Sequence, residues 1–446
     1  MAETLLSVGL DVGTTTTQMV LSRLRVENSA TGFAVPKMVI ADREIIYRSP
    51  VCFTPLQSGD LVDGEKIRTM VEDFYRQAGI DKKDVDTGAV IITGETSRKE
   101  NAAAVLSALA GFAGDFVAAA AGPDLESVLA AKGAGAVNHS AQTGEAVLHM
   151  DIGGGTSNLA LCLDGKVVRT GCMNVGGRLL KMEKTGKITY VSPVLQGLTD
   201  LQPGDYPGPC QVEAIAKILT GALEMAAGLR PATSLFERLQ TGEATPWQIP
   251  EAPLTISFSG GVADCIGKSG AFFGDMGAEL GQAIKNSLLC RSKYRLGTET
   301  IRATVIGAGS HSAQLSGSTV FCKDVSLPLK NLPVQMLSYQ EEIRIKNRDA
   351  DHVMLAFPGF QSPTYAQVAD LGEKLLKTGA EELLVCLEGD MAKALGQYLT
   401  LRGLKRCLCI DGIQPAPESY LDIGKPVGCA FPVVVKTLIL ENGGNL

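Results

Sequence analysis

The sequence predicts an α/β protein made of two similar lobes followed by a smaller β/α module. A strand, a glycine-rich turn and a second strand open the chain near residue 5, and the same pattern returns near residue 146. After residue 328, short apolar runs alternate with helical patterns. A chain of 446 residues supplies about three domain-sized units, so we expect lobes at 1–135 and 136–327 and the module at 328–446.

In the first lobe, apolar residues recur at the spacings typical of strands and amphipathic helices. Two strands flank the first glycine turn. Further strands are predicted at 44–53 and 88–92, and helices at 66–77 and 97–109. This alternation of strands and helices indicates an α/β unit.

The second lobe repeats this order, with a hairpin signal at Asp164-Gly165. Stretches with Pro and Gly but no periodicity, at 190–209 and 240–253, are predicted to be surface insertions. The repetition indicates an internal duplication of architecture. The strands of this lobe are predicted at 146–150, 159–163, 166–170, 254–258 and 302–306.

The third block is predicted to be a small parallel β/α module. Its last element, 432–440, consists mostly of β-branched residues and Leu, which is typical of a strand buried on both faces. The other strands are predicted at 353–356, 382–387 and 407–410, and the helices between them at 365–377 and 391–401.

Charge and cysteine content exclude several classes of protein. Lys and Arg number 41 and Asp and Glu 48, and this net charge of −7 argues against general binding to nucleic-acid phosphates or anionic lipid. No stretch reaches the roughly 18 apolar residues that a membrane helix needs. Eleven scattered cysteines without a Cys-x-x-Cys pair indicate reduced thiols. We therefore expect a cytoplasmic protein that binds neither nucleic acid nor membrane.

The first glycine turn carries residues suited to phosphate and magnesium. Asp11, at the end of the strand, can hold the water shell of Mg²⁺, an ion that keeps several waters beside one or two carboxylates. Backbone N–H groups near Gly13, with the hydroxyls of Thr14, Thr15 and Thr16, can surround phosphate oxygens. A single motif of this kind is equally typical of an ordinary turn with a capping carboxylate.

The second glycine turn repeats this sequence pattern, because Asp151 precedes Gly153 as Asp11 precedes Gly13. Two such hairpins, one in each lobe, are expected to face each other across a cleft, with Asp11 and Asp151 orienting Mg²⁺ from opposite walls. The phosphate-binding groups of this turn are predicted at Gly153, Gly154, Gly155 and Thr156.

Two further glycine turns are candidates for nucleotide binding. Ser259-Gly260-Gly261 follows a buried strand, where a Gly-Gly pair lets a ring or a phosphate lie against the backbone. Gly307 and Gly309 follow the last predicted strand of the second lobe, and for them a hinge or close packing against a helix is the alternative. His149 has no second histidine at ligand spacing, so we expect it to be structural.

In order and spacing, these four motifs resemble the phosphate-1, phosphate-2, adenosine and second connecting motifs of the actin, Hsp70 and sugar-kinase ATPase superfamily. Val175-Gly176-Gly177 resembles the Gly-Gly that opens a helix in the Hsp70-like branch. The motifs span about residues 5–325. This resemblance implies a two-lobed actin/Hsp70-like, ribonuclease H-like ATPase fold that closes over ATP and Mg²⁺, with an extra C-terminal β/α module.

A second resemblance covers essentially the whole chain. Residues 93–102, the stretch around 122–126 and the tail at 424–426 and 432–437 look like those of the ethanolamine ammonia-lyase reactivating factors of bacterial ethanolamine utilisation. It implies a chaperone-like ATPase that releases damaged cobalamin from the lyase, so that intact adenosylcobalamin enters. The implied partners are the lyase holoenzyme and ATP or ADP, and a homodimer and a bacterial microcompartment are left open.

Hydrolysis also needs a group that positions the attacking water. The candidates are Glu95, at the end of a buried strand, and Asp124 and Glu126, which fall where the Hsp70-like branch has its first connecting motif. That branch has a Glu before a Pro at this place, whereas this chain has Gly122 before Pro123. The choice among the three carboxylates therefore stays open.

Two other functions stay open at this point. A small-molecule kinase needs a catalytic Asp at the acceptor hydroxyl, and phosphate release without any acceptor separates it from an ATPase. A filament-forming or scaffolding protein of the actin-like branch would polymerise on addition of nucleotide, which sedimentation detects.

Overall fold

The chain was analysed as a computed structural model. It describes residues 3–13, 16–28, 38–58, 61–93, 105, 109, 118–120, 123–241, 254–268, 272–291, 293–311, 314–316, 319–345, 352–358, 360, 362–415, 419–426 and 430–437. Thr14, Thr15 and Glu95 lie outside these residues, as does the predicted helix at 97–109 apart from Val105 and Leu109.

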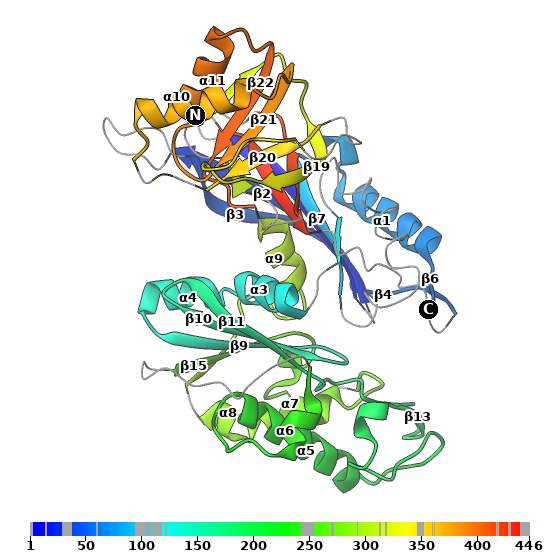
Figure 1. The fold of residues 1–446 in the computed structure, drawn as a ribbon. Helices are drawn as coiled ribbons and strands as arrows, with labels where there is room; N and C mark the ends of the chain where they lie inside the picture. The colour runs from blue at the N-terminus through cyan, green and yellow to red at the C-terminus, as the bar shows by residue number, and fades with distance from the viewer. Residues whose placement is uncertain are drawn as a thin grey trace, which may run out of the picture.

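The first sheet has the strand order β3-β2-β1-β7-β8 (Figure 1). Only β2 runs antiparallel to its neighbours β1 and β3, whereas β1, β7 and β8 are mutually parallel. The predicted strands at 44–53 and 88–92 are confirmed, the first of them divided between β3 and β4. The strands are β1 (Glu3–Val12), β2 (Thr16–Asn28), β3 (Met38–Arg48), β4 (Cys52–Phe53), which pairs with β2, β7 (Thr87–Ile92) and β8 (Ala118–Ala120).

Helix α1 (Gly64–Ala78) covers one face of this sheet, which confirms the predicted helix at 66–77. Asp63 caps its N-terminus by accepting a hydrogen bond from the backbone of Lys66, and Gly79 ends it in the left-handed conformation. Its apolar stripe enters the core beside β1 and β7. The short elements nearby are β5 (Leu56–Ser58), β6 (Leu61–Val62) and the 3₁₀ turn η1 (Lys82–Asp84).

The second sheet has the order β14-β11-β10-β9-β15-β16. Apart from β14, which pairs with β11 at one edge, its five strands are arranged as in the first sheet. Here β10 is antiparallel to its neighbours, and β9, β15 and β16 are parallel. Two sheets with the order 3-2-1-4-5 confirm the duplicated ribonuclease H-like fold. The strands are β9 (Ala146–Ile152), β10 (Ser157–Leu163), β11 (Lys166–Met173), β14 (Gln240–Thr241), β15 (Leu254–Ser259) and β16 (Tyr294–Leu296).

The hairpin predicted at Asp164-Gly165 is present, and both residues have positive φ angles, of 47° and 76°. Helices α5 and α7 bury their apolar faces in the core beneath this sheet. The remaining elements of the lobe are α4 (Ala136–Thr143), β12 (Leu180–Met182), β13 (Ile188–Val191), η3 (Pro193–Leu195), α5 (Pro209–Ala226), α6 (Ser234–Leu239), η4 (Ala263–Cys265), α7 (Gly277–Lys285) and α8 (Leu288–Arg291).

The strand predicted at 302–306 is wrong, because these residues open helix α9 (Ala303–His311). The fifth strand of the sheet is β16, eight residues earlier. Val305 and Ile306 are buried because α9 lies on the first sheet, where both pack against Val20. A Cβ at Gly9 would lie 2.3 Å from the carbonyl oxygen of Val305, so the helix rests on the backbone of β1.

Helices α3 (Pro123–Gly133) and α9 form the junction between the two lobes (Figure 1). Helix α3, which precedes the second sheet in the chain, packs on strands β9, β10 and β11 of that sheet. Helix α9, which follows the second sheet in the chain, packs on strands β1, β2 and β7 of the first sheet. Glycines bring their backbones together, since a Cβ at Gly133 would lie 1.8 Å from Ala303 O and one at Gly307 would lie 1.9 Å from Leu129 O. The bounds of the lobes stay a prediction.

The C-terminal module is an eight-stranded sheet whose strands β19 to β22 are parallel, as predicted for its core. Antiparallel strands extend this core on both sides, and they include the strand at 432–437, which the sequence predicted as part of a parallel module. Contacts of β17 with β3 and of β24 with β8 hold the module against the first lobe (Figure 1). The strands are β17 (Gln314–Leu315), β18 (Phe321–Lys323), β19 (Leu329–Met336), β20 (Met354–Phe357), β21 (Glu382–Leu387), β22 (Arg406–Asp411), β23 (Ser419–Ile423) and β24 (Pro432–Thr437).

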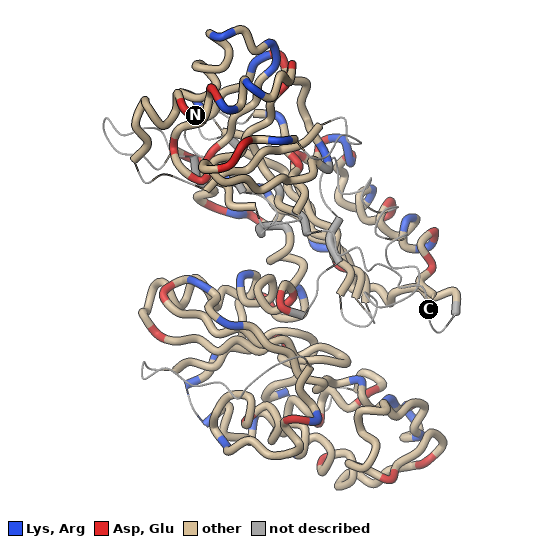
Figure 2. The backbone as a smooth tube through the Cα atoms, in the orientation of Figure 1, with Lys and Arg blue, Asp and Glu red and all other residues tan. Residues whose placement is uncertain are grey.

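Helices α10 (Tyr365–Leu376) and α11 (Ala392–Leu401) connect the parallel strands and pack into one core with them. A second core lies among β19 to β24 and holds Val433 at 0% exposure, in agreement with the buried strand predicted there. Figure 2 shows basic and acidic residues interspersed along the backbone of α1. In the part of the chain that the structure describes, no helix is long and apolar enough to cross a membrane.

Candidate functional site

The turn between β1 and β2 is closed by a backbone hydrogen bond from Gly13 N to Thr16 O of 2.9 Å. A Cβ at Gly13 would lie 3.1 Å from that same oxygen, so the turn is tight at this residue. Thr54 Oγ1 donates to Gly13 O at 2.7 Å and holds the turn from outside. Of the predicted phosphate-binding residues in this turn, Gly13 and Thr16 are placed by the structure, and Thr14 and Thr15 are not.

The turn between β9 and β10 has the same closing bond, from Gly153 N to Thr156 O at 2.9 Å. The loop after β11 lies against it, since Gly177 N donates to Gly153 O at 3.0 Å and Arg178 N donates to Gly154 O at 2.7 Å. Gly155 is exposed, and no atom lies within 4 Å of where its Cβ would be. The two predicted hairpins therefore have matching geometry, and the second one is open to a ligand.

Asp11 is a buried carboxyl group at the end of β1, with 7% of its surface exposed. Thr93 Oγ1 donates to its Oδ1 at 2.8 Å. The pKa of Asp11 is raised to about 7, mainly by burial and also by the charges of Glu126 and Asp151, against the opposing hydrogen bonds from Thr93 and Gln18. The structure thus brings Asp11 into the electrostatic range of carboxylates that come from two other elements.

Asp151 is the matching carboxyl group at the end of β9, with 9% of its surface exposed. Ser259 Oγ donates to its Oδ1 at 2.5 Å, and Thr304 Oγ1 of α9 donates to its Oδ2 at 3.2 Å. Burial raises the pKa of Asp151, and these two hydrogen bonds oppose the shift. Two buried carboxyl groups with raised pKa values mark a place where a cation would relieve the cost of burying negative charge.

His149 supports this arrangement from within the second sheet. Its Nε2 lies 2.9 Å from Ser259 Oγ and its Nδ1 lies 3.2 Å from Ser257 Oγ. Burial lowers the pKa of His149 to about 3, so the ring is neutral, and Nε2–H is assigned as the donor to the serine that itself donates to Asp151. The expected structural role of His149 fits this chain of hydrogen bonds, which orients Asp151.

The three candidates for positioning water have different surroundings. Glu126 on α3 is 6% exposed, and its Oε2 accepts a hydrogen bond from Asn158 Nδ2 at 2.8 Å. Asp124 is exposed and accepts a hydrogen bond from Thr170 Oγ1 at 2.5 Å. Glu95 lies outside the described residues. Among the described candidates, Glu126 is thus the one whose charge reaches Asp11.

Gln18 and Asn158 belong to this site and were missed in the sequence. Gln18 lies directly opposite Asp11 in the β1–β2 register, and Asn158 lies directly opposite Asp151 in the β9–β10 register. Their amide oxygens are buried and have no hydrogen-bond partner in the described residues. The signal that could have found them is an amide residue seven positions after the aspartate in both hairpins.

The turn Ser259-Gly260-Gly261 lies beside the second hairpin. Gly260 has a φ of 84°, and a Cβ there would lie 2.3 Å from Ile152 O, so glycine is required on both counts. Gly261 is exposed and has open space around its Cα. Gly307 and Gly309 lie inside α9 rather than after a strand, and Gly307 contacts the backbone of α3, as the alternative of helix packing predicted.

The donor set fits a hydrated magnesium ion. Carboxylate and amide oxygens are the ligands that Mg²⁺ takes, and the unpartnered oxygens of Gln18 and Asn158 flank Asp11 and Asp151. No group of three or more His, Cys, Asp or Glu side chains at metal-binding distance occurs among the residues described. The arrangement therefore suits an ion held largely through its own waters.

Comparison with known proteins gives one family. The family model described as ethanolamine utilisation protein EutA matches residues 3–441. Proteins from Salmonella typhimurium strain LT2 and Escherichia coli strain K12, both named ethanolamine ammonia-lyase reactivase EutA, are each 38% identical to this chain. Both alignments cover 97% of this chain and 98% of the relative. The ethanolamine utilization protein EutJ from Carboxydothermus hydrogenoformans is 16% identical, with a TM-score of 0.33, over 68% of this chain and 89% of its own.

Proposed function

The chain belongs to the family of ethanolamine utilisation protein EutA, and on this premise we propose that it is an ATP-hydrolysing reactivase of ethanolamine ammonia-lyase. The observation that carries the proposal is the pair of matching hairpins, each with a buried aspartate, an amide residue across from it and a glycine turn. Identity of 38% with two proteins named as reactivases of this lyase, over nearly the whole chain, supports the choice of partner.

We place the triphosphate between the two hairpins. Backbone N–H groups of the turns at Gly13 and at Gly153 to Gly155 donate to its phosphate oxygens, helped by the hydroxyls of Thr14, Thr15, Thr16 and Thr156. Gly261 lies where a flat adenine ring or a ribose can approach the backbone, and Gly260 holds the turn against Ile152. This arrangement binds by position and electrostatics, which are the main resources of phosphoryl transfer.

Asp11 and Asp151 would hold a hydrated Mg²⁺ between the hairpins, and the ion would supply charge compensation to the phosphates. Thr93 orients Asp11, and Ser259 with Thr304 orients Asp151. These hydrogen bonds hold each carboxylate in one rotamer. The site is therefore ordered before nucleotide arrives.

Glu126 holds the attacking water. Its buried carboxylate, which accepts a hydrogen bond from Asn158, positions a water that attacks the terminal phosphorus. The bond from that phosphorus to the bridging oxygen of ADP breaks, and the water proton passes to solvent or to the released phosphate. The exposed Asp124, and Glu95, which lies outside the described residues, remain the other candidates for this role.

Nucleotide state acts on the lyase through the arrangement of the lobes. Helices α3 and α9 form one contact between them, and a sliding of this pair changes how the lobes face each other. A lyase that binds one arrangement more tightly is released or strained when ATP favours the other. Damaged cobalamin then leaves the lyase in the cytoplasm, and intact adenosylcobalamin takes its place.

The test is reactivation of the lyase. Purified chain, with ATP, Mg²⁺ and adenosylcobalamin, is added to ethanolamine ammonia-lyase that has been inactivated on its own cobalamin. The expected result is recovery of ethanolamine deamination with ATP and none without nucleotide. Lack of recovery, when free adenosylcobalamin alone reactivates apo-lyase in the same buffer, contradicts the proposal. Phosphate release without an acceptor excludes a kinase, and unchanged sedimentation with ATP excludes a filament.

A further inference from the structure

Arg178 has its side chain seated on the second phosphate hairpin. Its backbone N–H donates to Gly154 O at 2.7 Å, and a Cβ at Gly154 would lie 3.2 Å from both Cγ and Cδ of this arginine. This close packing of the arginine on the hairpin requires a glycine at position 176, where a Cβ would lie 2.3 Å from Gly154 O. The stem of the side chain therefore runs over the loop that we assign to the phosphates.

The guanidinium group has one contact in each lobe. In the second lobe its Nε lies 3.5 Å from Asp275 Oδ2, and this buried Nε has no hydrogen-bond partner among the described residues. Its contact with the first lobe is Phe53, since the Cζ of Arg178 lies 5.7 Å from the centre of the Phe53 ring, within the range of a cation–π contact. Asp275 already accepts a hydrogen bond from Gly277 N at 2.9 Å, at the start of α7.

Phe53 places this contact beside the first hairpin. It lies on β4, directly opposite Thr16 of the first hairpin, and 74% of its surface is exposed. Arg178 thus spans from one hairpin to the edge of the other. A buried guanidinium nitrogen without a hydrogen-bond partner is costly, and an anion between the hairpins would supply the missing acceptor.

We propose that Arg178 is a ligand of the terminal phosphate of ATP, and that it gives up its contact with Phe53 when that phosphate binds. The inference rests on the proposed nucleotide site. A guanidinium presents its donors in a planar fork that matches two phosphate oxygens, which makes a stronger contact than an exposed cation–π pair. ADP leaves the position of the terminal phosphate empty, so the contact between Arg178 and Phe53 persists in the ADP state.

This competition makes the lobe-to-lobe contact depend on the third phosphate. The pair of Arg178 and Phe53 joins the lobes beside the first hairpin in the ADP state, and its loss in the ATP state removes one restraint on their movement. Arg178 thereby converts the presence of one phosphate into a change at the lobe interface.

The test is calorimetric titration with Mg·ADP and with the non-hydrolysable β,γ-imido analogue of ATP. In Arg178→Ala the affinity for the analogue is expected to fall about 10- to 100-fold and the affinity for ADP to change less than about twofold. Arg178→Lys keeps part of the preference. Phe53→Ala removes the competing contact, so affinity for the analogue rises about two- to fivefold while that for ADP stays the same.

Arg68→Ala on α1 and Phe273→Ala, also an exposed ring, are the matched controls and leave both affinities unchanged. Equal weakening of both ligands in Arg178→Ala and Arg178→Lys would show that the arginine only shapes the loop, which overturns the inference. An unaltered preference in Phe53→Ala overturns the competition. Absence of binding by the unmodified protein contradicts the proposed nucleotide site itself and the inference with it.

Discussion

Glu126 and Asn158 connect helix α3 to strand β10, because Oε2 of the glutamate accepts a hydrogen bond of 2.8 Å from Nδ2 of the asparagine. Asn158 is the residue directly opposite Asp151. The helix at the lobe junction is therefore tied to the strand paired with the one that carries Asp151, one of the two aspartates proposed to orient Mg²⁺. A movement of α3 changes the position of Glu126 relative to the proposed phosphate site.

Glu126→Gln is predicted to reduce hydrolysis about 100-fold or more and to leave nucleotide affinity within about threefold. The glutamine keeps an oxygen for Asn158 Nδ2 and removes the charge that positions water. Phosphate release and calorimetric titration measure the two quantities. Glu72→Gln is the matched control, since Glu72 is an exposed carboxylate on α1. Hydrolysis at the original rate in Glu126→Gln would move the role to Glu95 or Asp124.

Mg²⁺ is expected to raise the affinity for ATP, and Asp151→Asn is predicted to remove most of this gain. The variant's affinity for Mg·ATP is expected to fall about 10- to 100-fold. The amide keeps hydrogen bonds with Ser259 and Thr304 but lacks the charge that favours the hydrated ion. Titrations with Mg²⁺ and with a chelator measure this gain. Asp164→Asn, in a surface turn of the same lobe, is the control and keeps it. The same gain in both variants would argue that Asp151 does not face the ion.

Gly307→Ala is predicted to destabilise the protein by about 1–3 kcal/mol or more. The added Cβ would meet Leu129 O at 1.9 Å, so α3 and α9 must separate. Gly221→Ala in α5 is the control, because its Cβ meets nothing within 4 Å and alanine favours the helix by about 0.4–1 kcal/mol. Thermal unfolding followed by circular dichroism separates the two, and equal midpoints would contradict the tight crossing.

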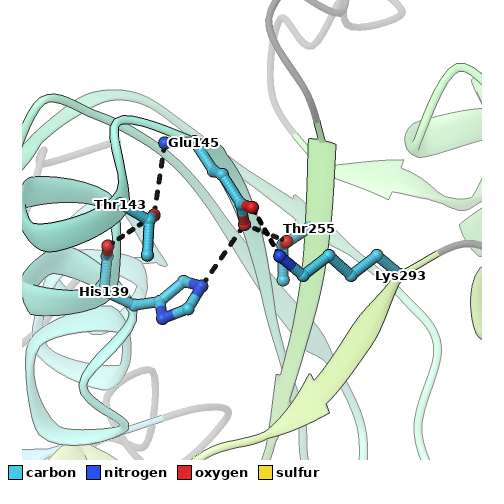
Figure 3. A network of polar contacts seen from close by, with 5 residues as sticks. All are labelled: His139, Thr143, Glu145, Thr255 and Lys293. Atoms are coloured by element: carbon cyan, nitrogen blue, oxygen red, sulfur yellow. Dashed lines mark hydrogen bonds and ion pairs between the residues drawn. The ribbon is translucent and has the colours of Figure 1, made fainter.

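Figure 3 shows Glu145 in a network of polar contacts in the second lobe. We predict that protonation of Glu145 makes this lobe less stable in acid. Glu145 joins Lys293, Thr255 and His139, and the hydrogen bonds from Lys293 and Thr255 lower the pKa of Glu145 from 4.5 to about 2. A lowered pKa in the folded state stabilises at pH above 4.5, and that stability is lost as the pH falls from 4.5 towards 2.

Glu145→Gln removes this titration. Urea unfolding between pH 6 and pH 3 is expected to show the unmodified protein losing stability faster than the variant over this window. Lys293→Met alone and the double variant Glu145→Gln/Lys293→Met report whether the ion pair is responsible. If it is, the pH-dependent difference in stability between these two variants must vanish. Parallel curves for the unmodified protein and Glu145→Gln would rule out a role for this network in acid unfolding.

The two hairpins were predictable because their signal is local. A strand, a glycine turn and a strand within about 20 residues carry their own hydrogen-bond pattern, so Asp11 and Asp151 could be placed at strand ends from the sequence. The residues across from them, Gln18 and Asn158, follow from the register of the same hairpins. This part of the site needed no knowledge of distant contacts.

The segment at 302–306 illustrates where local patterns fail. A short apolar run such as Val305-Ile306 is compatible with a buried strand and with a buried helix, and its length does not separate them. Here a helix results because α9 crosses to the first sheet and lies on Gly9. That contact joins residues almost 300 positions apart, which no short window contains.

The chain's own periodicity and turns were therefore enough to indicate two duplicated α/β lobes, their glycine turns and the parallel core of the module, since each depends on neighbours in sequence. The partners of Asp11 and Asp151, the burial of Glu126 and the span from Arg178 to Phe53 arise only when separate elements pack together. Burial and long-range contacts set the charge state and orientation of these groups, and both depend on the folded arrangement as a whole.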